Sequence, residues 1–105
     1  MKIELTDPAY IDLENIKDYI KRDSVYYANV FIEKIFDSID KLEDFPNIGR
    51  VVPEYKIENI REIFYKDYRI IYKIDNENNI IHIVAVIHGS RDLISNIRTI
   101  DILSS

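Results

Sequence analysis

The sequence contains no cysteine or tryptophan, and it holds only two glycines, three prolines and one methionine among its 105 residues. The lack of cysteine excludes a disulfide scaffold and any metal site with cysteine ligands, and it fits the reducing conditions of the cytoplasm. The longest apolar run, near residues 80–87, is interrupted by His82 and is far shorter than the roughly 20 residues that span a bilayer. The first residues become polar too soon for a signal peptide. We therefore expect a cytoplasmic chain with no membrane span.

The composition is that of a folded protein. Hydrophobic residues make up 47% of the chain and charged residues 31%, and no low-complexity tract occurs. A length of 105 residues suffices for one hydrophobic core and is short for two. We therefore expect a single domain over residues 1–105.

Acidic residues are concentrated in the first half of the chain. Residues 1–49 hold 6 basic against 11 acidic side chains, whereas residues 50–105 hold 8 of each, and the formal net charge is −5. Proteins that bind nucleic acid on their own usually carry an excess of cations to neutralise phosphates. We therefore expect no direct sequence-specific DNA binding by this chain. The acidic residues expected on the solvated outer face of the first half are Asp12, Asp18, Asp37, Asp40 and Glu43.

The first half has the pattern of a short strand followed by two helices. Ile3 and Leu5 alternate with polar residues, which predicts a strand over residues 2–6. Asp7 precedes Pro8, and we expect this aspartate to cap a helix that ends near Arg22. The apolar stripe of this helix consists of Ala9, Leu13, Ile16 and Ile20.

A second helix should begin after Ser24, whose hydroxyl can cap it. The sequence DFPNIG ends this helix. Because only about two residues link the two helices, we expect them to fold back on each other as an antiparallel hairpin. The apolar stripe of the second helix consists of Ala28, Ile32, Ile35, Ile39 and Leu42.

Residues 45–59 show no period that would predict a helix or a strand. An irregular connection of about 15 residues is long enough to suggest a function or a contact surface. It contains Gly49, a residue able to adopt a positive φ, followed by Arg50. We expect this segment to be a loop.

The second half predicts three strands. The dipeptide Lys66-Asp67 is expected to form the turn of a hairpin. The predicted fold class is α+β, with the order β-αα-βββ and the helical hairpin packed on a largely antiparallel four-stranded sheet. The three strands are expected over residues 60–65, 68–75 and 80–88. A short C-terminal helix is expected because apolar residues recur at helical spacing at Leu93, Ile97 and Ile100.

The turn lengths predict which strand residues face each other. With a loop over residues 76–79, the last two strands pair Lys73 with His82, Ile71 with Val84 and Arg69 with Val86. With the turn at Lys66-Asp67, the first hairpin pairs Phe64 with Arg69 and Glu62 with Ile71. The face expected to pack on the helices carries Tyr65, Tyr68, Ile70, Tyr72 and Ile74. The opposite face is expected to carry Glu62, Arg69, Lys73, His82 and His88.

Glu62, Arg69 and His88 have the chemistry that RNA hydrolysis needs. The 2′-hydroxyl must lose a proton to a base, the leaving oxygen must gain one from an acid, and a cation must stabilise the phosphorane. Histidine is the side chain best suited to move protons near neutral pH. In the structural alternative, Glu62 simply pairs with Arg69, and His88 only ends a strand.

A metal site is not expected. His82 and His88 are six residues apart on one predicted strand, which separates them by roughly 20 Å and prevents them from sharing an ion. We therefore expect neither a metal nor a cofactor.

Three segments resemble successive motifs of the RelE/ParE superfamily of type II toxin–antitoxin toxins, and above all its ParE branch. They are FPNIGR, IREIFYKDYRIIYKID and IIHIVAVIHGSRDL. The resemblance covers the chain from its first strand to about Leu93. It implies the β-αα-βββ fold, a cytoplasmic toxin that inhibits growth, and a cognate antitoxin that wraps the toxin and neutralises it.

The resemblance implies different chemistry for the two branches. RelE-type members cleave messenger RNA on the ribosome, whereas ParE-type members inhibit DNA gyrase. Arg69 matches an arginine of the nuclease branch, Arg91 roughly matches a second, and His88 resembles a histidine of some nucleases. A lysine pair before Arg61 is missing, and Ile97 stands where a tyrosine is expected.

We therefore expect a ParE-like gyrase inhibitor that is not an enzyme. The first alternative is a RelE-like ribosome-dependent endoribonuclease, and the second is a decayed toxin that only binds its antitoxin. In the nuclease alternative, the catalytic residues would be Glu62, Arg69, His88 and Arg91. Residues expected to contact the target or the antitoxin are Arg50, Arg61, Tyr68 and Lys73.

Overall fold

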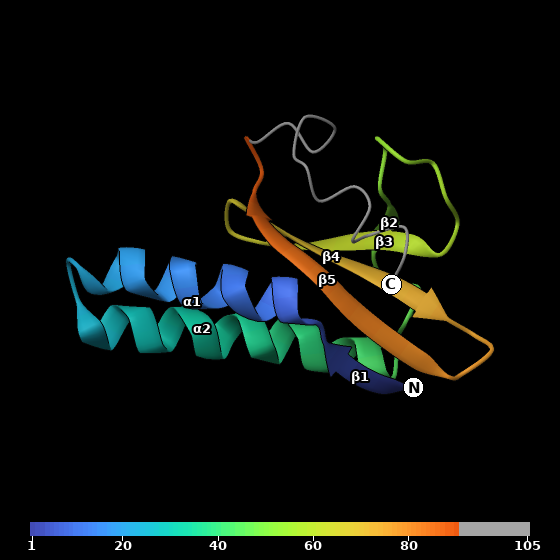
Figure 1. The fold of residues 1–105 in the computed structure, drawn as a ribbon, viewed down its shortest axis with the longest axis horizontal. Helices are drawn as coiled ribbons and strands as arrows, with labels where there is room; N and C mark the ends of the chain where they lie inside the picture. Colours follow the sequence, from blue (N-terminus) through green and yellow to red (C-terminus); the bar gives the residue numbers. More distant parts are fainter. Residues whose placement is uncertain (91–105) are drawn as a thin grey trace.

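Two helices and five strands make up the fold in the computed structural model, which describes residues 1–90 (Figure 1). The helices are α1 (Asp7–Lys21) and α2 (Val25–Asp40), followed by a short 3-10 helix at Lys41–Glu43. The strands are β1 (Lys2–Leu5), β2 (Arg50–Val51), β3 (Ile60–Tyr65), β4 (Tyr68–Asp75) and β5 (Ile80–His88). The predicted C-terminal helix lies outside the described residues.

The strands form one sheet in the order β1-β5-β4-β3-β2. Only β1 is parallel to its neighbour, β5, and all other pairs are antiparallel. The α+β prediction is therefore confirmed. The sheet has five strands rather than four because β2, at Arg50–Val51, lies within the segment predicted to be a loop. A strand of two residues is too short to show a sequence period.

The helical hairpin packs on one face of the sheet (Figure 1), and its caps fix where each helix begins. Ser24 caps α2 as predicted, since its hydroxyl accepts the N–H of Tyr27 at 3.0 Å. The cap of α1 is Thr6 and not Asp7. The Thr6 hydroxyl also donates to the Ile83 carbonyl at 2.7 Å, so this residue joins the start of α1 to β5.

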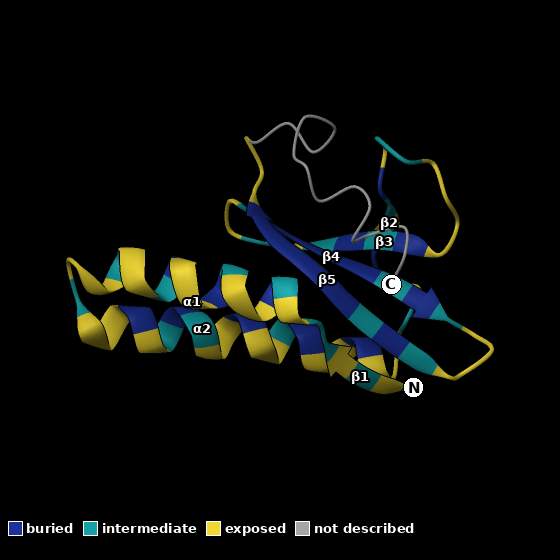
Figure 2. Cartoon of the chain, viewed as in Figure 1, coloured by how far each residue is buried: buried dark blue, intermediate teal, exposed yellow. Residues whose placement is uncertain are grey.

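Most residues of β4 and β5 are buried (Figure 2). Their side chains contribute to apolar clusters on both faces of the sheet. The face toward the helices carries Ile70, Tyr72 and Ile74, as predicted. In α2, Phe31 is buried, whereas Ile32 from the predicted stripe is only half-buried. The opposite face carries a second apolar cluster of Val52, Ile60, Ile71, Val84, Ala85 and Ile87, against which Tyr55 packs.

The predicted register holds for β3 with β4 and for the second half of β4, residues 72–75, with the start of β5. Lys73 faces His82, as predicted. Beyond a register shift between Ile71 and Tyr72, the prediction is wrong, because Ile71 faces Ala85 and Arg69 faces Ile87. The shift leaves one extra residue in β5, as a β-bulge does.

The bulge places His88 on the opposite face from the one predicted. A slip of one residue reverses the face of every side chain that follows it. His88 therefore pairs with Tyr68 and lies on the face that carries the helices. The prediction that His88 shares a face with Arg69 is wrong.

Asp12 is not part of the solvated outer face, contrary to the prediction. It is half-buried, and its Oδ2 accepts the backbone N–H of Val86 at 2.8 Å. β1 pairs with β5 only as far as Ile83, so this part of β5 has no neighbouring strand on that side. Asp12 therefore satisfies a strand amide that β1 does not reach.

No helix within residues 1–90 combines the length and apolarity needed to cross a bilayer.

Candidate functional site

Arg69 is the centre of a charged network on the sheet face opposite the helices. Its Nε donates to Glu62 Oε1 at 2.6 Å. Its two terminal nitrogens donate to the two carboxylate oxygens of Glu54 at 2.6 and 2.8 Å. Such fork-to-fork pairing is the strongest geometry that arginine makes with a carboxylate. The guanidinium is therefore held from two sides.

Glu62 joins this pair to a second arginine. Its Oε2 accepts a hydrogen bond from Arg50 Nε at 2.7 Å. The Glu62 side chain is fully buried, whereas the Arg50 side chain is 57% exposed and lies 5.1 Å from the ring centroid of Phe64. We refer to Arg50, Glu54, Glu62 and Arg69 as the ion network. Two carboxylates and two guanidiniums leave it formally neutral.

The contact between Glu54 and Arg69 keeps both of these groups charged. The hydrogen bonds from Arg69 hold the pKa of Glu54 below its ordinary value of 4.5. The hydrogen bond with Glu54, and then that with Glu62, raises the pKa of Arg69 above its ordinary range despite burial. A phosphate could use the Arg69 guanidinium only by displacing one of these carboxylates. The predicted cation is therefore present but already neutralised.

Arg61 and Tyr72 hold the loop that precedes β2. Arg61 donates to the carbonyl of Gly49 at 2.9 Å and to the Glu58 carboxylate at 2.8 Å. The Tyr72 hydroxyl accepts the N–H of Gly49 at 3.0 Å and donates to the Pro46 carbonyl at 2.7 Å. Burial raises the pKa of Tyr72, so this hydroxyl stays protonated. Arg61, predicted to contact a target or an antitoxin, is mainly engaged inside the chain.

Gly49 does not adopt a positive φ, so the predicted reason for this glycine is wrong. A Cβ at this position would lie 2.5 Å from the Glu62 carbonyl oxygen and 2.6 Å from the Tyr72 hydroxyl. Neither distance leaves room for a carbon atom. A glycine is therefore needed here for close approach of the backbone to β3.

His88 lies among aromatic side chains and apart from the ion network. Its ring is 5.4 Å from that of Tyr68, which in turn lies 5.5 Å from Phe31. Its Nδ1 is 2.7 Å from the Ser90 hydroxyl and accepts the Ser90 N–H at 3.2 Å. Tyr68 is half-buried, while His88 is exposed. Tyr68 and His88 are therefore both accessible to a partner that binds at this end of the sheet.

The four residues predicted for catalysis do not come together as a set. Glu62 and Arg69 are in contact, His88 is on the other face of the sheet, and Arg91 lies outside the described residues. The structural alternative, in which Glu62 pairs with Arg69, is confirmed. An acid and a base flanking a single phosphate are not present among these three side chains.

His82 and Lys73 lie on the same sheet face as the ion network, opposite the helices, and nearer the β4–β5 turn. His82 Nδ1 is 3.6 Å from Glu4, and its Nε2 is 3.7 Å from Asp75. The side-chain hydrogen bond from Asn78 lowers the pKa of Asp75. Lys73 is half-buried opposite His82. Within residues 1–90, no three histidine or acidic side chains are grouped closely enough to hold a metal ion.

Sequence reasoning did not identify Glu54 as a site residue. Glu54 accepts two hydrogen bonds from Arg69, whereas the predicted partner Glu62 accepts one. Glu54 belongs to the irregular segment and is separated from Arg69 by 15 positions. No period links a loop residue to a strand residue at that distance. Only the local excess of cations in the sheet, which calls for acidic partners, could have indicated it.

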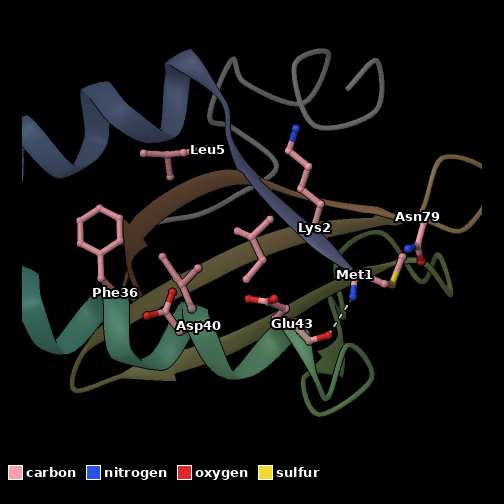
Figure 3. Close-up of a pocket in the computed structure, with 9 residues that line it drawn as sticks. Met1, Lys2, Leu5, Phe36, Asp40, Glu43 and Asn79 are labelled. Carbon is pink, nitrogen blue, oxygen red and sulfur yellow. Dashed lines mark hydrogen bonds between the residues drawn. The ribbon is translucent and has the colours of Figure 1, made fainter.

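A hollow of about 720 Å³ lies elsewhere, beside the edge strand β1 (Figure 3). Phe36 and Asp40 of α2 border it, and the N-terminal amine at its rim donates to the Glu43 carbonyl at 2.9 Å. Its lining residues are Met1, Lys2, Ile3, Leu5, Phe36, Ile39, Asp40, Glu43 and Asn79. None of the predicted site residues lines it.

The chain matches the family model described as the ParE toxin of the type II toxin-antitoxin system parDE, over residues 3–93. Its fold is similar to a chain of the chromosomal ParDE toxin–antitoxin system from P. aeruginosa, with a TM-score of 0.69 and 19% identity, covering 84% of this chain and 95% of that one. It is also similar to a chain of the toxin–antitoxin complex RelBE2 from Mycobacterium tuberculosis, with a TM-score of 0.54 and 22% identity, covering 83% and 95%. Comparison with curated proteins gives no match.

These comparisons agree with the sequence motifs and the strand order. The two structural similarities concern the fold, since both identities are below 25%. The family match is more specific, because it extends from β1 through the end of β5 and includes the residues of the ion network. The chain belongs to the ParE toxin family of type II toxin–antitoxin systems.

Proposed function

We propose that this chain is a cytoplasmic toxin that inhibits growth by binding DNA gyrase and that a cognate antitoxin neutralises it. The observation that supports this proposal best is the state of Arg69. Arg69 is only 5% exposed, and its guanidinium donates to two carboxylates. A group that must stabilise a phosphorane should instead have donors directed at the position of the phosphate.

Binding to a protein target makes no such demand. Inhibition of gyrase by contact requires a complementary surface and no catalytic acid, base or exposed cation. A net charge of −5 does not oppose binding to a protein as it opposes binding to nucleic acid. Exposed or half-buried residues at the β3–β4 turn and the end of β5, among them Lys66, Tyr68 and His88, are suitable contact residues.

The antitoxin is proposed to cover the helical hairpin. Seven large apolar or aromatic residues of the hairpin are exposed, and they are Tyr10, Ile11, Tyr19, Val25, Tyr26, Tyr27 and Phe36. Amphipathic segments that fold on binding commonly cover such surfaces in their partners. The similar solved structures belong to toxin–antitoxin systems, which supports a partner of this kind.

The alternative activity is a ribosome-dependent endoribonuclease. The similarity to a chain of the RelBE2 complex and the presence of Arg69 favour it. It would require Glu54 to leave Arg69 and a proton-transfer group other than His88 to approach. A decayed toxin that retains only antitoxin binding is the second alternative.

The deciding experiment is to induce the chain without antitoxin in a bacterial host and to follow incorporation of labelled thymidine and labelled amino acids over the first minutes. We expect DNA synthesis to stop first while translation continues. Co-expression with the product of an adjacent antitoxin gene is the control and should restore DNA synthesis. Early loss of translation would replace the proposal by the nuclease, and no effect on either would favour the decayed toxin.

A second assay uses purified components. The chain should inhibit supercoiling of relaxed plasmid by gyrase in proportion to its concentration, and addition of antitoxin should reverse this. Messenger RNA on translating ribosomes should remain intact under the same conditions. Cleaved RNA with unimpaired supercoiling would contradict the proposal.

A further inference from the structure

Residues 52–59, which we call the strap, run across the sheet face opposite the helices. Their ends are joined to the sheet by backbone hydrogen bonds, from Val52 N–H to Ile60 at 3.0 Å and from Ile74 N–H to Asn59 at 2.8 Å. Between residues 53 and 58, the only backbone hydrogen bond to the sheet found within residues 1–90 is a local one, from Ile60 N–H to the Ile57 carbonyl at 3.0 Å. The middle of the strap is therefore held by side chains.

Four side chains of the strap make these attachments, and one of them is the exposed Glu58, which accepts from Arg61 of β3. Val52 is fully buried and Tyr55 packs against the same apolar cluster. Glu54 makes the only one of these attachments that uses two charge-assisted hydrogen bonds, both to Arg69. Charge-assisted bonds are roughly twice as strong as neutral ones. The Glu54 to Arg69 contact is therefore the strongest single link at the centre of the strap.

Other features of the strap favour opening. Lys56 has a φ of 54°, a left-handed conformation that is unfavourable for a residue with a side chain. Residues 56–59 and Pro53 are exposed, so their side chains bury little surface against the sheet. The Glu54 side chain is 22% exposed, so water can reach the ion pair.

We infer that the strap is a releasable cover on the sheet and that the ion pair between Glu54 and Arg69 is the latch that holds it closed. When the latch opens, Val52 and Tyr55 leave the apolar cluster, and the Arg69 guanidinium keeps only its bond to Glu62. The rest of the fold stays intact, because α1, α2 and the hydrogen bonds between β3, β4 and β5 do not pass through the strap. This device is independent of which target the toxin binds.

The matched control is present in the strap itself. Glu58 also pairs with an arginine, since its carboxylate accepts from Arg61 at 2.8 Å, but its side chain is 81% exposed. An exposed ion pair contributes little to stability. Glu58→Gln therefore makes the same chemical change, in the same strap, without disturbing the latch.

The test is amide hydrogen exchange of the purified chain, comparing wild type, Glu54→Gln and Glu58→Gln. The reporters are the amides of Tyr55 and Lys56, which both donate to the Val52 carbonyl. We expect Glu54→Gln to accelerate their exchange about tenfold, as loss of a charge-assisted bond would. Glu58→Gln should change it less than about twofold. Amides of α2, and those of β4 other than Ile74, should exchange at the wild-type rate in both variants.

A second variant guards against a nonspecific effect of the glutamine. Glu54→Asp keeps the charge but withdraws the carboxylate by one methylene, and it should accelerate exchange of the same two amides. Equal exchange in the Glu54 and Glu58 variants would overturn the latch. Acceleration spread evenly over the sheet would overturn it too, because the pair would then serve global stability and not local closure.

Discussion

Gly49→Ala tests whether the backbone of the loop must approach β3 as closely as the structure shows. The added methyl group would lie 2.5 Å from the Glu62 carbonyl oxygen and 2.6 Å from the Tyr72 hydroxyl. The carbonyl is part of a strand and cannot move alone. The loop must therefore shift away from β3, which weakens two bonds, from Gly49 N–H to Tyr72 and from Arg61 to the Gly49 carbonyl.

The magnitude follows from these contacts. Overpacking costs about 1–3 kcal/mol, and weakening a hydrogen bond adds about 1 kcal/mol. The smaller conformational freedom of alanine in the unfolded chain offsets about 0.4–1 kcal/mol. We expect a net loss of about 2–4 kcal/mol in the free energy of unfolding, or a fall in Tm of roughly 10–20 °C for a chain of this size.

The chain's second glycine supplies the control. A Cβ at Gly89 would meet its nearest atom, the Asp67 carbonyl oxygen, at 3.1 Å, and Gly89 also lacks a positive φ. Gly89→Ala should therefore cost less than about 1 kcal/mol. Both variants are compared with wild type by urea unfolding, followed by circular dichroism. Equal stability of the two variants would refute the reasoning, because it would mean that the loop adapts to a methyl group without loss.

Three further predictions concern single contacts. Thr6→Ala removes the α1 cap and the bond to β5, so we expect urea unfolding to show a loss of about 1–2 kcal/mol. Asp12→Ala should accelerate hydrogen exchange of the Val86 amide at least about fivefold, because its side-chain acceptor is lost. The pKa of Glu54 is lowered on folding, so its contribution to stability is complete above its ordinary value of 4.5 and is lost as the pH falls through the lower folded-state pKa. The acid-induced loss of stability should therefore be smaller in Glu54→Gln, as measured by urea unfolding at a series of pH values.

The fold was predictable because the apolar periods of its main elements are regular. The predicted stripe of α1 and the bounds of β3, β4 and β5 agree with the structure, and the predicted stripe of α2 agrees except at Ile32, whose place in the core Phe31 takes. The short strand β2 was not predictable, since two residues carry no period. The cap of α1 was misplaced by one residue because Thr6 and Asp7 are both good capping residues, and only the nearby Ile83 carbonyl favours the threonine.

The position of His88 could not be predicted for a different reason. Residues 83–87 are all apolar and nearly all fully buried, because both faces of β5 are covered there. Alternation of polar and apolar residues reveals a bulge only where one face is solvated. The extra residue in β5 therefore leaves no mark in the sequence, and every side chain after it was assigned to the wrong face. The error moved a presumed catalytic histidine across the sheet.

The distribution of charge gives the last constraint on partners. After position 49 the sequence contains as many basic as acidic residues. The sequence does not reveal that these residues pair with one another. In the structure, Arg50, Arg61 and Arg69 each donate to a carboxylate of the same half. Most of the acidic excess of residues 1–49 lies on the exposed sides of the helical hairpin. A partner that covers the hairpin should therefore combine apolar side chains with lysines and arginines.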